Sequence, residues 1–365
     1  MTSHLPRTIG LSAAVAAVLA LTACGSDNNG GTPNNQSTTK ADCATGSIMA
    51  SGSSAQANAM SEWIKGYNAQ CSGATINYQS VGSGAGVQAF IQGSTAFAGS
   101  DSALKDEEHA PADARCKTGK AIDLPMVAGP IAVAYNLPGV DSLTLTPSLI
   151  AKIFSGKITK WDDAAIAAAN SGAKLPSTAI QTFHRSDSSG TSDNFTKYLT
   201  AAAGSDWTYD HAKEWKAPGG QGAKGSDGVT TSVKQTEGAV TYVEYSFAKD
   251  ASLGVAKVDN GAGAVELSTD SVGKAVEAAT VTGTGNDLSL KLDYATKAAG
   301  AYPIALVTYE ITCEKGLDAA QLSLVKSFLT YTSSSAGQSV LADLGYAPIP
   351  ASLLTKVQAS VAALS

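Results

Sequence analysis

The sequence predicts an α/β protein made of two lobes that a hinge connects. Short apolar strands alternate with helical patterns from residue 47 to residue 101, which is typical of a parallel sheet covered by helices. Two long apolar runs, 122–135 and 303–312, have the character of strands that cross from one lobe to the other. The chain has 365 residues, which is too long for one small domain and fits two lobes.

Lobe one is expected to use both ends of the chain. We assign residues 43–128 and 306–365 to lobe one and residues 129–305 to lobe two, so that lobe two is inserted between the crossing strands. Two-lobed hinge proteins built in this way usually close around a ligand.

The first elements of lobe one follow a βαβαβ order. Strands are expected at 47–50, 75–81 and 96–98, the last ending in Gly99-Ser100-Asp101. Two helices lie between them, because apolar residues recur at helical spacing. Their apolar faces consist of Met60, Trp63, Ile64 and Tyr67 in the first helix and of Val87, Phe90 and Ile91 in the second.

Lobe two repeats the alternation. We expect a helix around 149–154, a strand at 180–184, a helix that starts at Thr191, a flexible glycine-rich loop at 219–228 and a strand at 239–245. After Thr312 the pattern turns helical to the end of the chain. Asp318 with Gln321 has the spacing of a capping box, and Leu322, Val325, Phe328 and Leu329 give that helix one apolar face.

The N-terminus has the features of an export signal. Arg7 precedes an uncharged apolar run, Ile9 to Leu21, which is too short to span a bilayer stably. The run ends in Leu21-Thr22-Ala23-Cys24, which resembles a bacterial lipobox. We therefore expect a lipoprotein signal peptide at 1–23, lipidation of Cys24 and a flexible tether at 24–42, because that stretch is almost without apolar side chains. The alternative is an ordinary signal peptide with a chance cysteine.

Four further cysteines suit an oxidising compartment, and two disulfides are expected. Three connectivities are open. We prefer Cys71–Cys116 with Cys43–Cys313, because this pairing closes one local loop and staples the start of the chain to a late strand. A metal site is not expected, since the sequence has neither a C-x-x-C motif nor a paired-histidine spacing. The formal net charge of −6 also makes the chain a poor binder of nucleic acid.

Three turns place small hydroxyl residues and glycines just ahead of helices. They are residues 51–54, 82–86 and 185–191. Each helix N-terminus offers unpaired N–H groups and a partial positive charge, so the three together suggest a cage for a small multivalent oxyanion. Arg185 adds a planar fork of donors, which Asp187 could hold in place. The alternative for the serines is simple helix capping, and for Arg185 a surface ion pair.

Asp101 follows a nearly apolar strand and would face the predicted cage. A carboxylate suits such a place if the ligand carries a proton that it can accept. Phosphate retains a proton near neutral pH, its relevant ionisation lying at about 6–7, whereas sulfate has none to give. Asp101 would therefore favour phosphate and reject sulfate. The alternative is an aspartate that only caps a turn or a helix.

The chain resembles the periplasmic or lipid-anchored phosphate-binding proteins of Pst-type ABC transporters. The resemblance rests on residues 50–54, 81–86, 97–101 and 185–192, with further support at 157–163 and 238–245, and it extends from about residue 43 to the C-terminus. It implies a type II periplasmic solute-binding fold with dehydrated phosphate in the cleft between the lobes. It also implies a binding protein without catalytic residues or cofactors, whose partners are inorganic phosphate and the permease subunits in the membrane.

The same resemblance implies the ligands. From lobe one, Ser54 and Ser83 donate hydroxyls, the backbone N–H of Ala55 donates, and Asp101 accepts. From lobe two, Arg185, Ser189, Gly190 and Thr191 close over the ion, and Asp187 steadies Arg185. The first loop of the family often has Thr followed by Phe, where this chain has Ser54 and Ala55. This difference leaves open whether Ser53 or Ser54 is the ligand. A monomer on the outer face of the bacterial cytoplasmic membrane is expected.

The sequence leaves three rival functions to consider. A lipid-anchored hydrolase of phosphate esters has little support, because the G-x-S-x-G elbow is absent and only three histidines remain after processing. A sulfate or molybdate binder of the same fold is disfavoured by Asp101. A lipid-anchored adhesin or scaffold without a small ligand is the third.

Overall fold

The computed structural model describes residues 42–365. The predicted signal peptide, the lipidation site Cys24 and the predicted tether up to residue 41 lie outside the described residues. Among the helices of residues 42–365, none combines the length and the apolar character that a membrane span needs.

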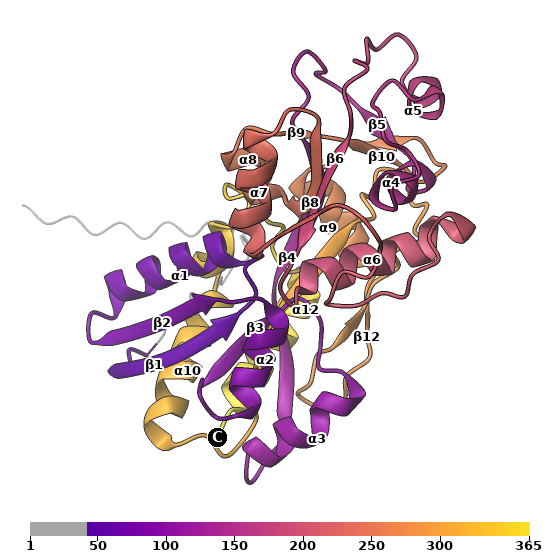
Figure 1. Ribbon diagram of the computed structural model, residues 1–365. Helices are drawn as coiled ribbons and strands as arrows, with labels where there is room; N and C mark the ends of the chain where they lie inside the picture. Colours follow the sequence, from indigo (N-terminus) through magenta and orange to yellow (C-terminus); the bar gives the residue numbers. More distant parts are fainter. Residues whose placement is uncertain (1–41) are drawn as a thin grey trace, which may run out of the picture. The chain divides into compact units, whose positions relative to one another are not determined.

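The central element is one mixed sheet of nine strands. Its order is β2-β1-β3-β14-β4-β8-β6-β7, and β9 pairs with β4 (Figure 1). The strands of this sheet are β1 (Gly46–Gly52), β2 (Ala74–Ser80), β3 (Phe97–Ser100), β4 (Ala121–Tyr135), β6 (Gln181–Arg185), β7 (Gln221–Ala223), β8 (Ala239–Glu244), β9 (Gly254–Val255) and β14 (Ala305–Cys313). Two small sheets consist of β5 (Thr144–Leu145), β10 (Lys257–Asp259) and β11 (Ala264–Val265), and of β12 (Thr280–Val281) and β13 (Leu290–Lys291).

The helices connect these strands. They are α1 (Ala57–Gln70), α2 (Ser83–Ile91), α3 (Asp106–Arg115), α4 (Pro147–Phe154), α5 (Ala164–Ala169), α6 (Gly190–Ala202), the 3-10 helix η1 (Gly204–Asp206), α7 (Gly225–Gln235), α8 (Tyr245–Asp250), α9 (Thr269–Glu277), α10 (Ala319–Thr332), α11 (Ser335–Ser339) and α12 (Ala351–Ala363).

The βαβαβ start of the fold is confirmed. Strand β1 pairs in parallel with both β2 and β3, and the helices α1 and α2 lie between these strands in sequence. Met60, Trp63 and Tyr67 of α1 are buried, as the helical spacing predicts, whereas Ile64 is half-buried at the margin of the core. The parallel pairing brings the carboxyl ends of β1, β2 and β3 to one edge, where ligands bind in such sheets.

Strand β4 is shared by two groups of strands. All fifteen of its residues are buried. Residues 121–130 pair antiparallel with β14, and residues 131–135 pair antiparallel with β8. In Figure 1, β1 to β3 lie on one side of β4, and β6 and β8 lie on the other. The predicted crossing strands at 122–135 and 303–312 are therefore real strands, while the lobe boundaries drawn through them stay a prediction.

The predicted loop at 219–228 is wrong. Residues Gln221–Ala223 form β7, which pairs in parallel with β6, and α7 begins at Gly225. The high glycine content made both elements hard to predict from the sequence. Strand β7 is short, and it forms its hydrogen bonds with β6, which lies far away in sequence. Gly225 has a φ of 72°, a backbone conformation that favours glycine at the turn between them.

The predicted capping box at Asp318 is also wrong. Asp318 is the N-cap residue of α10, but its side chain makes no capping hydrogen bond. Its Oδ1 atom lies 3.4 Å from Nζ of Lys117 instead. The apolar face of this helix is confirmed for Val325, Phe328 and Leu329, which are buried.

The predicted disulfide pairing is wrong in both bonds. The structure joins Cys43 to Cys71 and Cys116 to Cys313. Cys43 and Cys71 precede the paired parallel strands β1 and β2, so the register of that pair places them side by side. Cys313 ends β14 opposite Ala121, the first residue of β4, and the chain reaches Ala121 shortly after Cys116. Sheet register, which the spacing of cysteines does not reveal, selects this connectivity.

We predict that loss of the Cys116–Cys313 bond destabilises the protein more than loss of the Cys43–Cys71 bond. The bonds close loops of 197 and 28 residues. The chain-entropy model then gives about 5 kcal/mol for the long loop and about 3.5 kcal/mol for the short one. Urea unfolding of the two double Cys→Ser variants measures the difference. Equal losses in the free energy of unfolding, or peptide mapping that recovers other cysteine pairs, would contradict this assignment.

Candidate functional site

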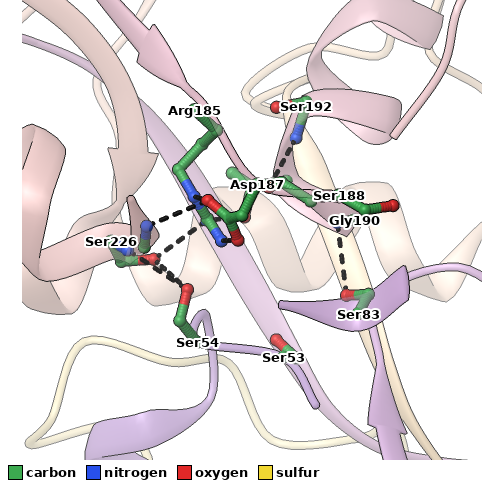
Figure 2. A network of polar contacts seen from close by, with 12 residues as sticks. Ser53, Ser54, Ser83, Arg185, Asp187, Ser188, Gly190, Ser192 and Ser226 are labelled. Atoms are coloured by element: carbon green, nitrogen blue, oxygen red, sulfur yellow. Dashed lines mark hydrogen bonds and ion pairs between the residues drawn. The ribbon is translucent and has the colours of Figure 1, made fainter. Parts of the chain in front are cut away.

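The predicted site residues converge at the carboxyl edge of the sheet. The backbone N–H of Gly190 donates to Oγ of Ser83 over 3.2 Å, and the N–H of Ser226 donates to Oγ of Ser54 over 3.1 Å. Figure 2 shows Ser54 and Ser83 facing Ser226, Gly190 and Arg185 across this point. The structure thus brings together groups from chain segments more than 100 residues apart.

Glycines allow the turns to approach one another. A Cβ atom on Gly190 would lie 2.6 Å from Oγ of Ser83 and 2.7 Å from Oδ2 of Asp101. A Cβ atom on Gly82 would lie 2.4 Å from Oδ2 of Asp187, and its φ of 94° also favours glycine. The glycine-rich character of these turns is therefore a condition for the contact between the β2–α2 turn and the turn that leads into α6.

Asp101 is a buried acceptor surrounded by hydroxyl donors. Its side chain is 3% exposed. Oδ1 accepts from Oγ of Ser53 over 2.5 Å and from Oγ1 of Thr308 over 2.8 Å, and Oδ2 accepts from Oγ of Ser83 over 3.0 Å. Burial raises the pKa of Asp101 to about 6, against the opposing effect of these hydrogen bonds and with a smaller contribution from the charge of Glu244. The group therefore titrates near the pH at which phosphate itself does.

Arg185 provides a positive charge that is held in one orientation. Its side chain is 2% exposed, and Asp187 accepts from its Nε over 2.7 Å and from its Nη2 over 2.5 Å. Burial alone would lower the pKa of Arg185, but the hydrogen bonds and the charge of Asp187 outweigh it and raise that pKa. The same contact keeps the pKa of Asp187 below its usual value in spite of burial. Asp187 thus fixes the guanidinium, as the sequence suggested.

Three residues of the site were not predicted from the sequence: Thr308, which donates to Asp101, and Glu244 and Ser226. Glu244 ends β8, is fully buried, and accepts from Oγ1 of Thr191 over 2.5 Å and from Oγ of Ser226 over 2.6 Å. Nη1 of Arg185 lies 3.4 Å from both of these hydroxyl oxygens. Ser226 lies in the glycine-rich segment whose sequence predicts a loop, where the structure has the start of α7. The signal for Glu244 was a lone carboxylate at the end of an apolar strand, the same signal that identified Asp101.

The remaining predicted ligands have contacts of their own. Oγ of Ser189 caps α6 by accepting from the N–H of Ser192, and the N–H of Ser189 donates to the carbonyl of Lys213. The N–H of Ala55 donates to Oγ of Ser53 over 3.0 Å. Neither Ser54 nor Ser83 is an N-cap residue, since Gln56 and Gly82 hold those positions. Capping therefore does not account for the hydroxyls of Ser54 and Ser83.

Comparison with known proteins gives consistent results. Residues 37–336 match the family model of the PBP superfamily domain. The phosphate-binding protein PstS 3 of Mycobacterium tuberculosis is 44% identical over 96% of this chain and 96% of its own length. PstS 2 of the same species is 41% identical over 97% and 98%.

Solved structures share the two-lobed fold. A high-affinity periplasmic phosphate-binding protein (PfluDING), solved with bound phosphate, superposes with a TM-score of 0.71 over 86% of this chain and 93% of its own, at 24% identity. A phosphate-binding protein from Stenotrophomonas maltophilia superposes with a TM-score of 0.68 over 86% and 94%, at 22% identity. The predicted fold class is thereby confirmed.

We predict that Asp101 makes the stability of the protein fall as the pH rises from 4 to 7.5. A carboxyl whose pKa rises on folding, here from 3.8 to about 6, binds its proton more tightly in the folded state. Its contribution is complete below pH 3.8 and is lost as the pH passes through about 6. The Asp101→Asn variant should therefore gain about 2–3 kcal/mol relative to the wild type over this range. Urea unfolding of both proteins in phosphate-free buffers measures it, and a constant difference would contradict the raised pKa.

Proposed function

Because the chain belongs to the PstS family of phosphate-binding proteins, we propose that it binds inorganic phosphate at this site and delivers it to the permease of an ABC transporter. One observation supports this most: the buried carboxylate Asp101 accepts from Ser83, and Ser83 also accepts from the N–H of Gly190, in the turn that begins with the fixed Arg185. A purely anionic ligand would be repelled by Asp101, whereas a protonated oxyanion can donate to it.

Ser54, rather than Ser53, is the proposed hydroxyl ligand of the first turn. The hydroxyl of Ser53 donates to Oδ1 of Asp101, and the same hydroxyl oxygen accepts from the backbone N–H of Ala55. Ser54 instead faces Ser226, whose hydroxyl oxygen is 3.4 Å from Nη1 of Arg185. Phosphate oxygens would accept hydrogen bonds from Ser54, from Arg185 and from the N–H groups of the α6 turn, where Gly190 and Thr191 begin the helix.

Ser83 and Asp101 would exchange partners when phosphate binds. In the structure the single hydroxyl hydrogen of Ser83 is donated to Oδ2 of Asp101. We propose that this hydrogen turns to a phosphate oxygen, and that the P–OH group of phosphate then donates to Oδ2. The number of hydrogen bonds at Oδ2 is conserved for phosphate. Sulfate has no hydrogen to supply and would leave a buried carboxylate facing a bare oxygen, which is costly.

Closure of the two proposed lobes would complete the site. One proposed lobe consists of residues 43–128 with 306–365, and the other consists of residues 129–305. Contacts between these segments support such closure. They include the hydrogen bonds of Ser54 with Ser226 and of Gly190 with Ser83. A nearly buried ion pair also joins them, with Nζ of Lys213 3.4 Å from Oε1 of Glu108. Because β4 and β14 run between the segments, they are the proposed hinge.

The proposed location is the outer face of the cytoplasmic membrane. The signal peptide at 1–23 would direct export, Cys24 would carry the lipid, and the tether that follows would leave the binding unit free to reach the permease. The relatives are named as binding proteins, which supports a non-enzymatic role, and a monomer fits the proposal. Incubation with phosphate esters tests the hydrolase alternative, for which no turnover is expected.

We predict that Arg185→Ala lowers phosphate affinity by at least about thirtyfold, and by up to several thousandfold. Removing one partner of a buried, hydrogen-bonded charge contact costs about 2–5 kcal/mol. Isothermal titration of phosphate-depleted protein measures the dissociation constant. Arg115→Ala is the matched control, since that arginine lies over the ring of Phe90 and contacts Thr95 instead of the site. Equal affinities of the two variants would refute the role of Arg185.

We predict that Asp101→Asn weakens the rejection of sulfate more than it weakens phosphate binding. An asparagine amide can donate to a sulfate oxygen, whereas the carboxylate cannot. Competition of excess sulfate with labelled phosphate measures the preference. Asp123→Asn is the matched control, because Asp123 is buried in the same sheet but accepts from Leu104 and Ser289. An unchanged preference for phosphate over sulfate in Asp101→Asn would show that the acceptor role is wrong.

A further inference from the structure

A further buried carboxyl group, Glu310, lies near Asp101 of the proposed phosphate site. Glu310 is in β14, two residues after Thr308, and is fully buried. Within residues 42–365, neither of its side-chain oxygens has a hydrogen-bond partner. The side-chain oxygen of Gln56 also lacks a partner there, and the Gln56 amide lies close enough to Glu310 to influence its ionisation. Three acceptor atoms without donors are thus gathered in one buried place.

Gln56 leads directly to the site. Its Nε2 atom donates to the hydroxyl of Tyr78 over 3.1 Å, and that hydroxyl donates to the carbonyl of Ser53 over 2.8 Å. Ser53 in turn donates to Asp101. Gly99 pairs with Glu310 in the sheet and leaves room for this series of hydrogen bonds. A Cβ atom on Gly99 would lie 2.2 Å from Nε2 of Gln56 and 2.4 Å from the Tyr78 oxygen. A continuous run of polar groups therefore joins Gln56 to the phosphate ligands.

The hydrogen count along this run fixes the orientation of Gln56. Tyr78 has one hydroxyl hydrogen, and it is donated to Ser53. Tyr78 can then only accept from Gln56, which requires the amide nitrogen on that side and leaves the amide oxygen without a donor. The amide nitrogen of Gln56 carries a second hydrogen, and its contact with Glu310 lowers the pKa of that carboxyl group. An ionised Glu310 has no hydrogen to give, so Oε1 of Gln56 would stay without a donor at a high cost. One proton on Glu310 supplies the missing donor.

We propose that Glu310 is a protonated carboxylic acid that donates to Oε1 of Gln56 and thereby positions the Ser53–Gln56 segment for phosphate binding. This inference rests on the proposed function. Glu310 is a positioning residue in this account, since it acts on the ligand through Gln56, Tyr78 and Ser53. Its neutrality has a second consequence: Glu310 adds no negative charge beside Asp101 when a phosphate dianion arrives.

The electrostatic surroundings agree with a neutral Glu310. Burial raises its pKa well above the usual value, the Gln56 amide lowers it by less, and the charge of Asp101 adds to the rise. The groups that face it are Gln56 ahead of α1, Tyr78 of β2 and Asp101 at the end of β3, and none of these is a cation. The pKa of Tyr78 is likewise raised, chiefly by burial, so its hydroxyl stays protonated.

The direct test uses the unaltered protein. Carbon-13 NMR of the full-length mature chain, labelled at glutamate carboxyl carbons, follows each group from pH 5 to pH 8.5. We expect one glutamate signal to keep the chemical shift of a protonated carboxyl after all other glutamate signals have moved to the ionised position, and this signal to be missing in Glu310→Gln. If every glutamate signal moves to the ionised position below pH 6, the proposal is overturned. This outcome does not depend on whether the chain binds phosphate.

The functional test compares two variants by titration with inorganic phosphate between pH 6 and pH 8.5. Glu310→Gln keeps a neutral donor, so its affinity should stay within about threefold of the wild type at each pH, with the same pH profile. Glu310→Leu removes the donor and should lower the affinity about tenfold. A tenfold gain in Glu310→Gln at pH 8 would reveal an ionised Glu310, and wild-type affinity in Glu310→Leu would refute positioning. If the wild type binds no phosphate, the proposed function fails while the NMR result stands.

Discussion

The acceptor contacts of Asp101 are the constraint on which the rest of the structure depends. A carboxylate at the floor of an anion site is tolerated only if donors surround it, and here they come from three separate segments: Ser53 after β1, Ser83 after β2 and Thr308 in β14. Those segments meet because the sheet has the order β2-β1-β3-β14. The parallel pairing of β1 with β2 and β3 aligns their carboxyl ends, and the antiparallel β14 brings Thr308 alongside. The topology is therefore what makes a buried acceptor possible.

The lobe-two side of the proposed site contributes a positive charge, but it does not make the site strongly positive. One guanidinium, Arg185, lies near the carboxyl groups of Asp187 and Glu244, and Glu244 also acts on Asp101. In the proposed complex, attraction by net charge thus contributes little, and the ion would be held by oriented donors that are fixed before it arrives. Asp187 orients the guanidinium, and Glu244 orients the hydroxyls of Thr191 and Ser226. A neutral Glu310 fits the same arrangement, because each additional buried charge would weaken the binding of a dianion.

Much of this arrangement could be predicted from the sequence, and the failures have a common physical cause. Local patterns identified β1 to β3, the crossing strands, α1 and the turns with Ser54, Ser83, Asp101 and Arg185, because helix periodicity and turn composition are local properties. The cysteine pairing, strand β7 and the contacts of Thr308 and Ser226 depend on register between segments far apart in the sequence. Glu310 looked like one more residue of an apolar strand, and only its unpartnered oxygens distinguish it.

The most direct measurement is a crystal structure of the protein grown with inorganic phosphate. The account predicts tetrahedral density enclosed by Ser54, Ser83, Gly190 and Arg185, with one phosphate oxygen at hydrogen-bond distance from Oδ2 of Asp101. Density at another place, or an Asp101 side chain that turns away from the bound ion, would contradict it.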